Sequence, residues 1–289
     1  MAVRIVSDTT GYLPAEIVAR AGIELVSLSV HWDSREQREI EMTDFDSFYA
    51  NLHDAKTLPT TSQPSIGEFL TIYRPILEAG DEIVSVHLAS ALSGTAEAAR
   101  QAKEHLEREG VDGRRIVVID SACACGGLGL ITLAGAQAAS SGATQDQVIA
   151  AVESMKANLK MWFAVDTLEY LRRGGRIGGA AAWFGTTIKI KPILTVGADG
   201  ITPVERVRTR ARAMDHLIQL GEAHFQPGGC VIVQHIQAPE LADQVMQRCR
   251  AAFGCEPVAF GEIGPVIGSH VGPGLIGLAI GPANLVDLT

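Results

Sequence analysis

The first half of the chain alternates short runs of β-branched residues with segments of helical periodicity. The strand-like runs cover residues 3–7, 23–30, 82–88 and 115–119, and the helical segments cover 14–21, 44–53, 65–79, 95–109 and 126–140. Parallel strands need a long crossover, usually a helix, whereas tight turns join antiparallel strands. The alternation therefore predicts an α/β domain with a mostly parallel sheet, and any ligand is expected beyond the carboxyl ends of its strands.

The second half has a different character and predicts a second domain. Two long helical segments, 209–225 and 239–253, interrupt strand-like runs at 161–165, 188–196, 201–206, 229–235, 257–260 and 275–280. The turn Gly197-Ala198-Asp199-Gly200 is typical of a hairpin. This order predicts an α+β domain with a largely antiparallel sheet. A helix over 144–159, capped by Thr144 with Gln147 three residues on, links residues 1–158 to residues 159–289.

The charge and the cysteines limit the location and the partners of the chain. The formal charge is −9, from 24 basic and 33 acidic residues, which argues against nucleic-acid binding. No apolar run approaches the roughly 20 residues of a membrane span, so no stable membrane insertion is expected. The N-terminus begins directly as a strand. Five cysteines, an odd number, indicate reduced thiols and a cytoplasmic location. Cys123 and Cys125 lack a second pair, and we interpret them as small residues that open a helix rather than as metal ligands.

Three predicted strands of the first half end in short polar groups. They are 7–10, 90–95 and 120–121. Because the strands are expected to be parallel, these groups should lie along one edge of the sheet. Capping of a helix or a turn explains each group taken alone, but three of them together favour at least one contact with a ligand.

Two of the polar stretches are crowded with hydroxyl groups and carry no charged side chain. They are 59–65 and 90–95, and both resemble loops that end in the first turn of a helix. Such turns leave backbone N–H groups free and favour an anion. The chemistry on offer is hydrogen-bond donation to a carboxylate or a phosphate. Because no activated nucleophile is evident, binding is favoured over catalysis.

Sequence motifs for common enzymes are absent. The chain has no Walker-type loop, no G-x-G-x-x-G after the first strand, no G-x-S-x-G and no H-E-x-x-H. The remaining catalytic alternative is an acyl- or phosphoryl-transfer enzyme that uses Ser93 or Asp8 as nucleophile and His270 as base. His270 lies in the glycine-rich segment 268–274, which is expected to be a loop. There it either bonds the backbone or faces a ligand as a donor or a base.

A short helix over 168–176 is expected to end at two glycines, with Arg172, Arg173 and Arg176 near its end. Favourable pairing with the helix dipole explains these cations, although one of them could instead reach a carboxylate or a partner. Lys189 and Lys191 are expected on one face of a strand, by default facing solvent.

At this point five segments, taken together, resemble the DegV family. They are Thr61-Ser62-Gln63-Pro64-Ser65, Leu92-Ser93-Gly94-Thr95, 168–176, 188–194 and 264–274, and they follow the family's order over nearly the whole chain. The resemblance implies a bacterial cytoplasmic protein that holds a long-chain fatty acid, such as palmitate, between a Rossmann-like N-terminal domain and a C-terminal α+β domain. One departure is Ala96, where the family often has an aromatic residue, and it concerns the length of the bound chain more than the head group.

The resemblance also implies roles for single residues. Thr61 and Ser93 would hold the carboxylate, and His270 would be a nearby contact. Further possible contacts are Ser62, Gly94, Thr95, Arg172 and Arg173. The protein would present the fatty acid to a fatty acid kinase, which forms the acyl phosphate, and would need no cofactor and perform no catalysis. A lipid-responsive regulator remains a second alternative.

Overall fold

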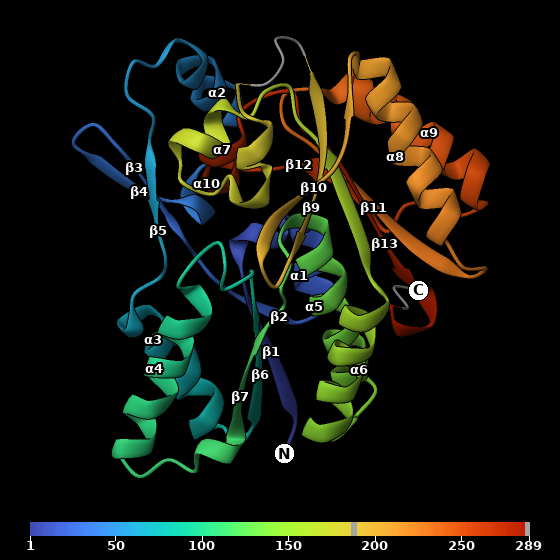
Figure 1. The fold of residues 1–289 in the computed structure, drawn as a ribbon. Coiled ribbons are helices and arrows are strands. Elements are labelled where there is room, and N and C mark those ends of the chain that lie inside the picture. The colour runs from blue at the N-terminus through green and yellow to red at the C-terminus, as the bar shows by residue number, and fades with distance from the viewer. Residues whose placement is uncertain (186–189, 287–289) are drawn as a thin grey trace.

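The computed structural model describes residues 1–185 and 190–286 and arranges them around three sheets (Figure 1). Sheet A has four strands in the order β2-β1-β6-β7, and all three pairings are parallel. Its strands are β1 (Val3–Asp8), β2 (Ile23–Val26), β6 (Glu82–His87) and β7 (Ile116–Asp120). The predicted α/β class with a parallel first sheet is confirmed.

Helices cover both faces of sheet A. One face packs on α3 (Ile66–Glu78) and α4 (Thr95–Arg108) around a core that includes Phe69 and Ile83. The other face packs on α5 (Cys125–Ser140) and α6 (Gln145–Asn158). The short helix α1 (Ala15–Arg20) lies beside β2. The predicted capping pair at the start of α6, Thr144 and Gln147, is present, and Ser65 and Glu68 form a second such pair at the start of α3.

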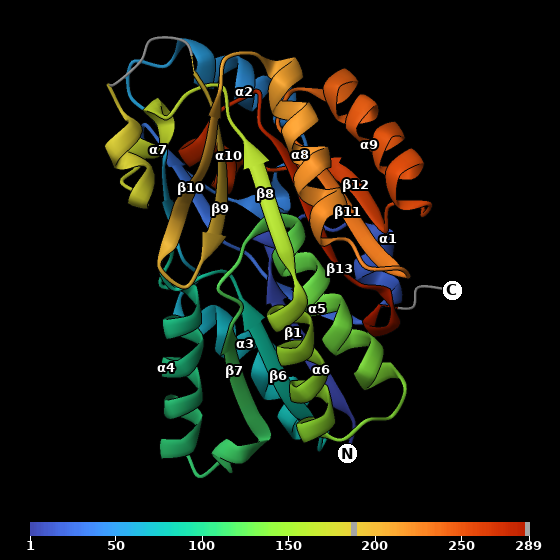
Figure 2. The same ribbon diagram turned by 45° about the vertical axis from the view of Figure 1, so that its right-hand side comes forward.

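Sheet C has six strands in the order β10-β9-β8-β13-β11-β12, and every pairing except β11 with β12 is antiparallel. Its strands are β8 (Lys160–Ala164), β9 (Lys191–Gly197), β10 (Gly200–Val207), β11 (Gly229–His235), β12 (Ala259–Glu262) and β13 (Ile276–Pro282). The long helices α8 (Arg210–His224) and α9 (Pro239–Phe253) cover its outer face, as Figure 2 shows. The hairpin between β9 and β10 forms at the predicted turn. Ile188 and Lys189 lie outside the described residues.

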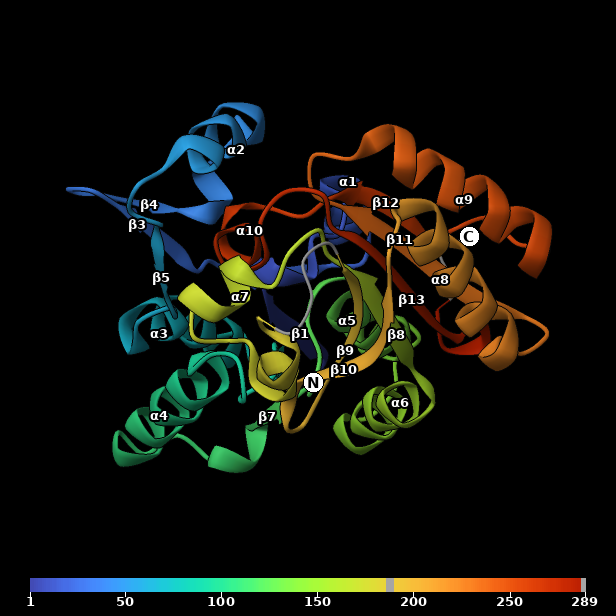
Figure 3. The same ribbon diagram turned by 45° about the horizontal axis from the view of Figure 1, so that its top comes forward.

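Helix α5 lies between sheets A and C, at the centre of the view in Figure 3. Residues 126–136 are all buried, which agrees with a helix that is apolar all round. Glycines allow the close packing on both sides. A methyl group at Gly126 would overlap Ile232 of sheet C, and one at Gly135 would overlap Val152 of α6.

A third, small sheet projects from the body beside α2 (Phe45–Asp54). It contains β3 (Ser29–Trp32), β4 (Arg35–Arg38) and β5 (Thr60–Ser62) in the order β4-β3-β5. Two predictions are wrong here. Residues 23–30 form two strands of different sheets rather than one strand, because the chain turns at Ser27, whose hydroxyl bonds Leu28 and Ile40. Residues 60–62 form an edge strand rather than a loop.

Short helices and 3-10 turns complete the fold. They are α7 (Glu169–Arg173), α10 (Pro265–Val271) and the 3-10 turns η1 (Thr9–Gly11), η2 (Glu39–Glu41), η3 (Gly113–Arg115), η4 (Gly178–Trp183) and η5 (Ala283–Leu285). The predicted loop over 268–274 is therefore partly wrong, because His270 lies in the last turn of α10. No helix in the described parts of the chain is both long and apolar enough to cross a membrane.

Candidate functional site

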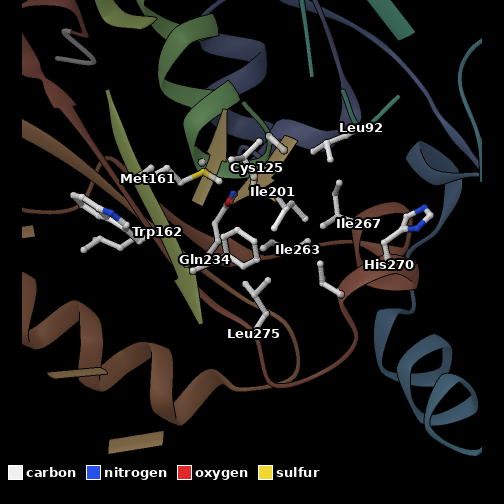
Figure 4. A pocket seen from close by; sticks show the side chains of 18 of the residues that line it. Leu92, Cys125, Met161, Trp162, Ile201, Gln234, Ile263, Ile267, His270 and Leu275 are labelled. Carbon is white, nitrogen blue, oxygen red and sulfur yellow. The ribbon is translucent and has the colours of Figure 1, made fainter. Parts of the chain in front are cut away.

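An apolar cavity lies between the inner face of sheet C, the start of α5 and the helices α7 and α10. The cavity is narrow, with a volume of about 70 Å³ for the centres of water-sized molecules, and it is partly open to solvent. Figure 4 shows the side chains of its wall, which is mostly aliphatic and aromatic and includes Met161, Phe163, Ile232, Ile263, Ile267 and Leu275. Such a wall suits the tail of an amphipathic ligand.

The alternation of β13 places the small residues Gly277 and Ala279 on the inner face of sheet C, and Leu275 precedes the strand. Leu275, Gly277 and Ala279 line the cavity, whereas Ile276 and Ile280 pack in the core under α8 and α9. Side chains alternate along a strand, and Leu278 is the residue of this second set that also borders the cavity. Gly277 pairs with Phe163 on β8 and with Gln234 on β11, so a residue without a side chain lies between two lining residues of the cavity.

One end of the cavity carries a polar pair that joins α10 to the small sheet. The Nε2 atom of His270 lies 2.8 Å from the hydroxyl oxygen of Thr61 on β5. The Nδ1 atom of His270 is buried and has no hydrogen-bond partner among the described residues. Gly174, at the end of α7, allows the imidazole to approach, because a methyl group there would overlap Nδ1. This close approach explains why a glycine follows α7.

The second hydroxyl loop contacts the first. Ser93 and Thr95 share a hydrogen bond of 2.9 Å between their hydroxyl oxygens, and a methyl group at Gly94 would overlap the side chain of Gln63. The hydroxyl of Ser62 bonds His31 on β3 at 2.7 Å, so Ser62 is used within the small sheet. Leu92, next to Ser93, lines the cavity. The structure thus brings the two predicted stretches together at the polar end.

The three arginines of 168–176 separate in space. Arg172 forms an ion pair with Glu169 at 2.7 Å and stacks on the ring of Phe184. Arg173 donates to the carbonyl oxygen of Lys56 at 3.2 Å. Arg176 alone among the three lines the cavity, and it donates from Nε to the carbonyl of Leu92 at 3.2 Å and from Nη1 to that of Gly174 at 2.8 Å. It therefore joins α7 to the loop that carries Ser93.

His270 is neutral at physiological pH. Burial, and to a smaller extent the positive charge of Arg176, lower its pKa from 6.5 to about 4. A neutral imidazole carries one N–H. If that proton resides on Nε2, it is donated to Thr61, whereas a proton on Nδ1 would be a buried donor without an acceptor. We therefore assign the proton to Nε2, which leaves the hydrogen of the Thr61 hydroxyl free to point at an anion.

Replacing Arg176 by methionine is expected to raise the pKa of His270 without restoring it to 6.5. The charge of Arg176 is the smaller of the two causes of the lowered value, and burial remains. NMR titration of the His270 ring protons measures the change, with Arg172→Met as the matched control on the same segment. A pKa that is equal in Arg176→Met and the wild type would contradict the assigned electrostatic coupling.

Helix α10 is held at its N-terminal end by residues of the first half of the chain. Glu39 of η2 accepts hydrogen bonds from the backbone N–H of Val266 at 2.8 Å, from the hydroxyl of Thr9 at 2.6 Å and from that of Tyr12 at 2.8 Å. Burial raises the pKa of Glu39 to about 7. The hydroxyl of Tyr49 donates to the carbonyl of Ile263 at 2.6 Å, just before α10. These bonds set the position of His270.

The polar ends of the sheet A strands meet along one edge, as predicted. Asp8 accepts hydrogen bonds from the backbone N–H of Leu88 at 3.0 Å and from Thr10, and Ser90 donates its N–H to Asp120 at 3.2 Å. Asp8 also contacts His87 at 3.1 Å, and both side chains are fully buried. Asp8 is therefore engaged in this network and not paired with His270, which is bonded to Thr61.

The two cysteines of the predicted helix start have different surroundings. Cys123 is buried beside the sulfur of Met161, 3.6 Å away, whereas Cys125 lines the cavity. Burial raises the pKa of both thiols, which disfavours the thiolate form that binds metals and attacks substrates. Within the described residues, no group of three or more His, Cys, Asp or Glu side chains could hold a metal ion.

Three residues of the site were not found from the sequence. Gln234 lines the cavity from β11 and bonds η1, Arg176 was not singled out among the arginines, and Glu39 holds α10. Gln234 alone left a local signal, since it is a polar residue in the otherwise apolar run 230–234. Glu39 has no local signal in the sequence, because its partner Val266 is 227 residues away.

Comparisons with known proteins agree on one family. Residues 2–283 match the family model described as "Uncharacterised protein, DegV family". A DegV domain-containing protein of Streptomyces coelicolor is 39% identical over 283 residues, which cover 96% of this chain and 98% of that protein. A solved DegV family protein from Thermus thermophilus, described as fatty acid binding, is 29% identical with a TM-score of 0.89, and the match covers 98% and 100% of the two chains. DegV from Bacillus subtilis, described as a fatty acid binding protein, is 31% identical with a TM-score of 0.86 and coverage of 97% and 99%.

Proposed function

The chain belongs to the DegV family, and we propose that it binds one long-chain fatty acid in the apolar cavity. The carboxylate lies at Thr61, Ser93 and His270, and the tail lies along the inner face of sheet C. The observation that carries the proposal is an apolar cavity with a hydroxyl–imidazole pair at one end. Solved relatives that are described as fatty acid binding support the ligand class.

The energetics favour an amphipathic acid over a small anion. Each buried methylene contributes about 0.8 kcal/mol, so the tail supplies most of the affinity. The head group then needs hydrogen bonds that replace those of water. Thr61 and Ser93 are half-buried and donate hydroxyl hydrogens. Arg176 carries the positive charge among the described residues that line the cavity. This charge attracts the carboxylate of the fatty acid without a buried ion pair within the protein.

Delipidated protein is expected to bind stearate tightly, and Thr61→Val combined with Ser93→Ala is expected to weaken that binding by at least about 100-fold. A hydrogen bond to a charged group contributes about 1.5–3 kcal/mol, and two such bonds are lost. Isothermal titration calorimetry measures the affinity. The matched control is Thr60→Val with Ser90→Ala, because both side chains are exposed neighbours of the tested hydroxyls. An equal loss in the control would remove Thr61 and Ser93 from the head-group site, and wild-type protein that takes up no fatty acid would overturn the binding function.

We further propose that the bound carboxylate is presented to a fatty acid kinase, which forms the acyl phosphate with its own ATP. The partial exposure of Thr61 and Ser93 supports access to the head group from outside. In an assay with kinase, ATP and stearate, hydroxylamine trapping should detect acyl phosphate only when this protein is present. A lipid-responsive regulator would bind stearate equally and yield no acyl phosphate. Turnover of a fluorogenic ester by this chain alone would instead favour an acyl-transfer enzyme.

A cytoplasmic location belongs to the same proposal. All five cysteines are free, and a reducing compartment maintains thiols in that state. A kinase that consumes ATP would act there as well.

A further inference from the structure

The cavity wall contains the amide of Gln234 away from the head-group end, and the hydrogen bonding of this amide is incomplete among the residues that the structure describes. Gln234 of β11 is only 2% exposed and lines the cavity. In Figure 4 its amide group projects among apolar side chains, between Met161 on one side and Ile201 on the other. A buried amide in such surroundings is costly unless its donors and its acceptor are all used.

The donors of this amide are used within the protein. The Nε2 atom donates to the carbonyl oxygen of Gly11 at 3.1 Å and to that of Tyr12 at 3.0 Å. Both carbonyls belong to the turn that follows β1, so the amide joins sheet C to the first half of the chain. Its orientation is fixed by chemistry, because the opposite assignment would place Oε1 against two carbonyl oxygens, which are acceptors only.

The acceptor of the same amide is not used. Oε1 is buried and has no hydrogen-bond partner among residues 1–185 and 190–286. A partner must therefore come from what occupies the cavity. It must be a donor, and the fixed amide cannot rotate to serve an acceptor without losing its bonds to Gly11 and Tyr12.

We propose that Gln234 selects a fatty acid that carries a hydroxyl group partway along its chain. The inference rests on the proposed function, since it places the acyl tail in this cavity. A chain hydroxyl would donate to Oε1 and satisfy two buried polar groups at once. A site that is built to bond a ligand hydroxyl discriminates against an analogue without it, because the protein group is then left unpaired.

The proposed ligand differs from other polar fatty acids in that its chain carries a hydrogen-bond donor. A keto group at the same carbon has a similar size and polarity but accepts hydrogen bonds only, so it would oppose Oε1. Stearate has no polar group in its chain and measures binding of the tail alone. A mid-chain hydroxystearate, the matching oxostearate and stearate therefore form a complete set of probes for this wall.

Wild-type delipidated protein is expected to bind the best positional isomer of hydroxystearate about tenfold more tightly than the oxostearate with the same substituted carbon, as one buried hydrogen bond implies. In Gln234→Met, which cannot accept from the ligand, this ratio should fall to about one, while stearate still binds. A series of positional isomers locates the carbon that lies at Oε1. The control is Gln237→Met, an exposed glutamine beyond the end of the same strand, which should retain the tenfold ratio.

Each outcome is decisive. Equal binding of hydroxystearate and oxostearate to the wild type, at every position tested, overturns the inference, because an enclosed water molecule then serves Oε1 as well as a ligand does. The same holds if Gln234→Met keeps the wild-type ratio. If that variant fails to fold, the wild-type ratio alone still tests the inference. Failure of all three ligands to bind wild-type protein would instead contradict the proposed function.

Discussion

Replacing Gly277 by leucine is expected to weaken stearate binding by about 100-fold while the protein remains folded. Gly277 lies on the inner face of sheet C, beside Phe163 and Gln234, and lines the cavity. A methyl group at this position meets only ordinary contacts, the nearest 3.7 Å away at Leu275, so a larger side chain extends into the cavity. Leucine would displace about three or four methylenes of the tail, each worth about 0.8 kcal/mol.

The comparison with Gly277→Ala separates obstruction of the cavity from damage to the strand. Alanine adds the Cβ atom without reaching far into the cavity, so stearate affinity should change by less than about threefold, the effect of a fraction of one methylene. Shorter fatty acids should lose less affinity than stearate in the leucine variant. Calorimetric titration gives the affinities, and thermal unfolding of the unliganded variants checks the fold. If Gly277→Leu binds stearate like the wild type, the tail does not follow the inner face of sheet C.

Glu39→Gln and His270→Gln are expected to change the pH dependence of stability in opposite directions. Burial raises the pKa of Glu39 from 4.5 to about 7, so between these values the folded protein retains a proton that the unfolded chain has lost. Stability from this carboxyl is present at low pH and is lost as the pH rises through the window. Burial lowers the pKa of His270 from 6.5 to about 4, so its contribution is present above 6.5 and is lost as the pH falls toward 4.

The two contributions oppose each other between about pH 4.5 and 6.5 in the wild type, and each corresponds to about 1.4 kcal/mol per pH unit. Relative to the wild type, the free energy of unfolding of Glu39→Gln should therefore rise with pH by about 3 kcal/mol across this range. That of His270→Gln should fall by a similar amount. Glutamine retains an acceptor at position 39 for the N–H of Val266, and at position 270 it approximates the reach of Nε2.

Urea unfolding at a series of pH values measures these differences. Glu41→Gln is the matched control, because Glu41 belongs to the same turn as Glu39 but is exposed. Carboxylates elsewhere, such as Asp112, whose pKa the side chain of Arg114 lowers to about 2, titrate equally in all variants and cancel in the comparison. Parallel profiles for Glu39→Gln and the wild type would show that Glu39 is ionised throughout the range.

The elements predicted correctly from sequence are those whose signal is local. The alternation of strands and helices predicted sheet A and its helices, and the cap at Thr144 marked the start of α6. Where the local signal is weak, the predictions missed elements. All four residues of β4 are exposed, so the strand has no apolar alternation, and α10 has seven residues with a glycine inside.

The same division applies to the candidate site. The hydroxyl stretches and His270 were identified from short motifs, and the structure brings Thr61 and His270 within hydrogen-bond distance. The residues that complete the site depend on distant partners. Gln234 bonds Gly11, which is 223 residues away, and no pattern within one segment encodes such a pairing. Arg176 differs from Arg172 and Arg173 only in the direction that the chain takes after two glycines.

The position of α5 has a consequence for how the protein folds as a whole. Its buried surface packs against sheet A on one side and against sheet C on the other. Neither sheet therefore has a complete core without α5. A segment that ended after α6 would expose the face of α5 around Gly126, and the remaining segment would expose the inner face of sheet C. We therefore expect the two halves of the sequence to unfold together. A ligand in the cavity, by binding only the folded form, stabilises both sheets together.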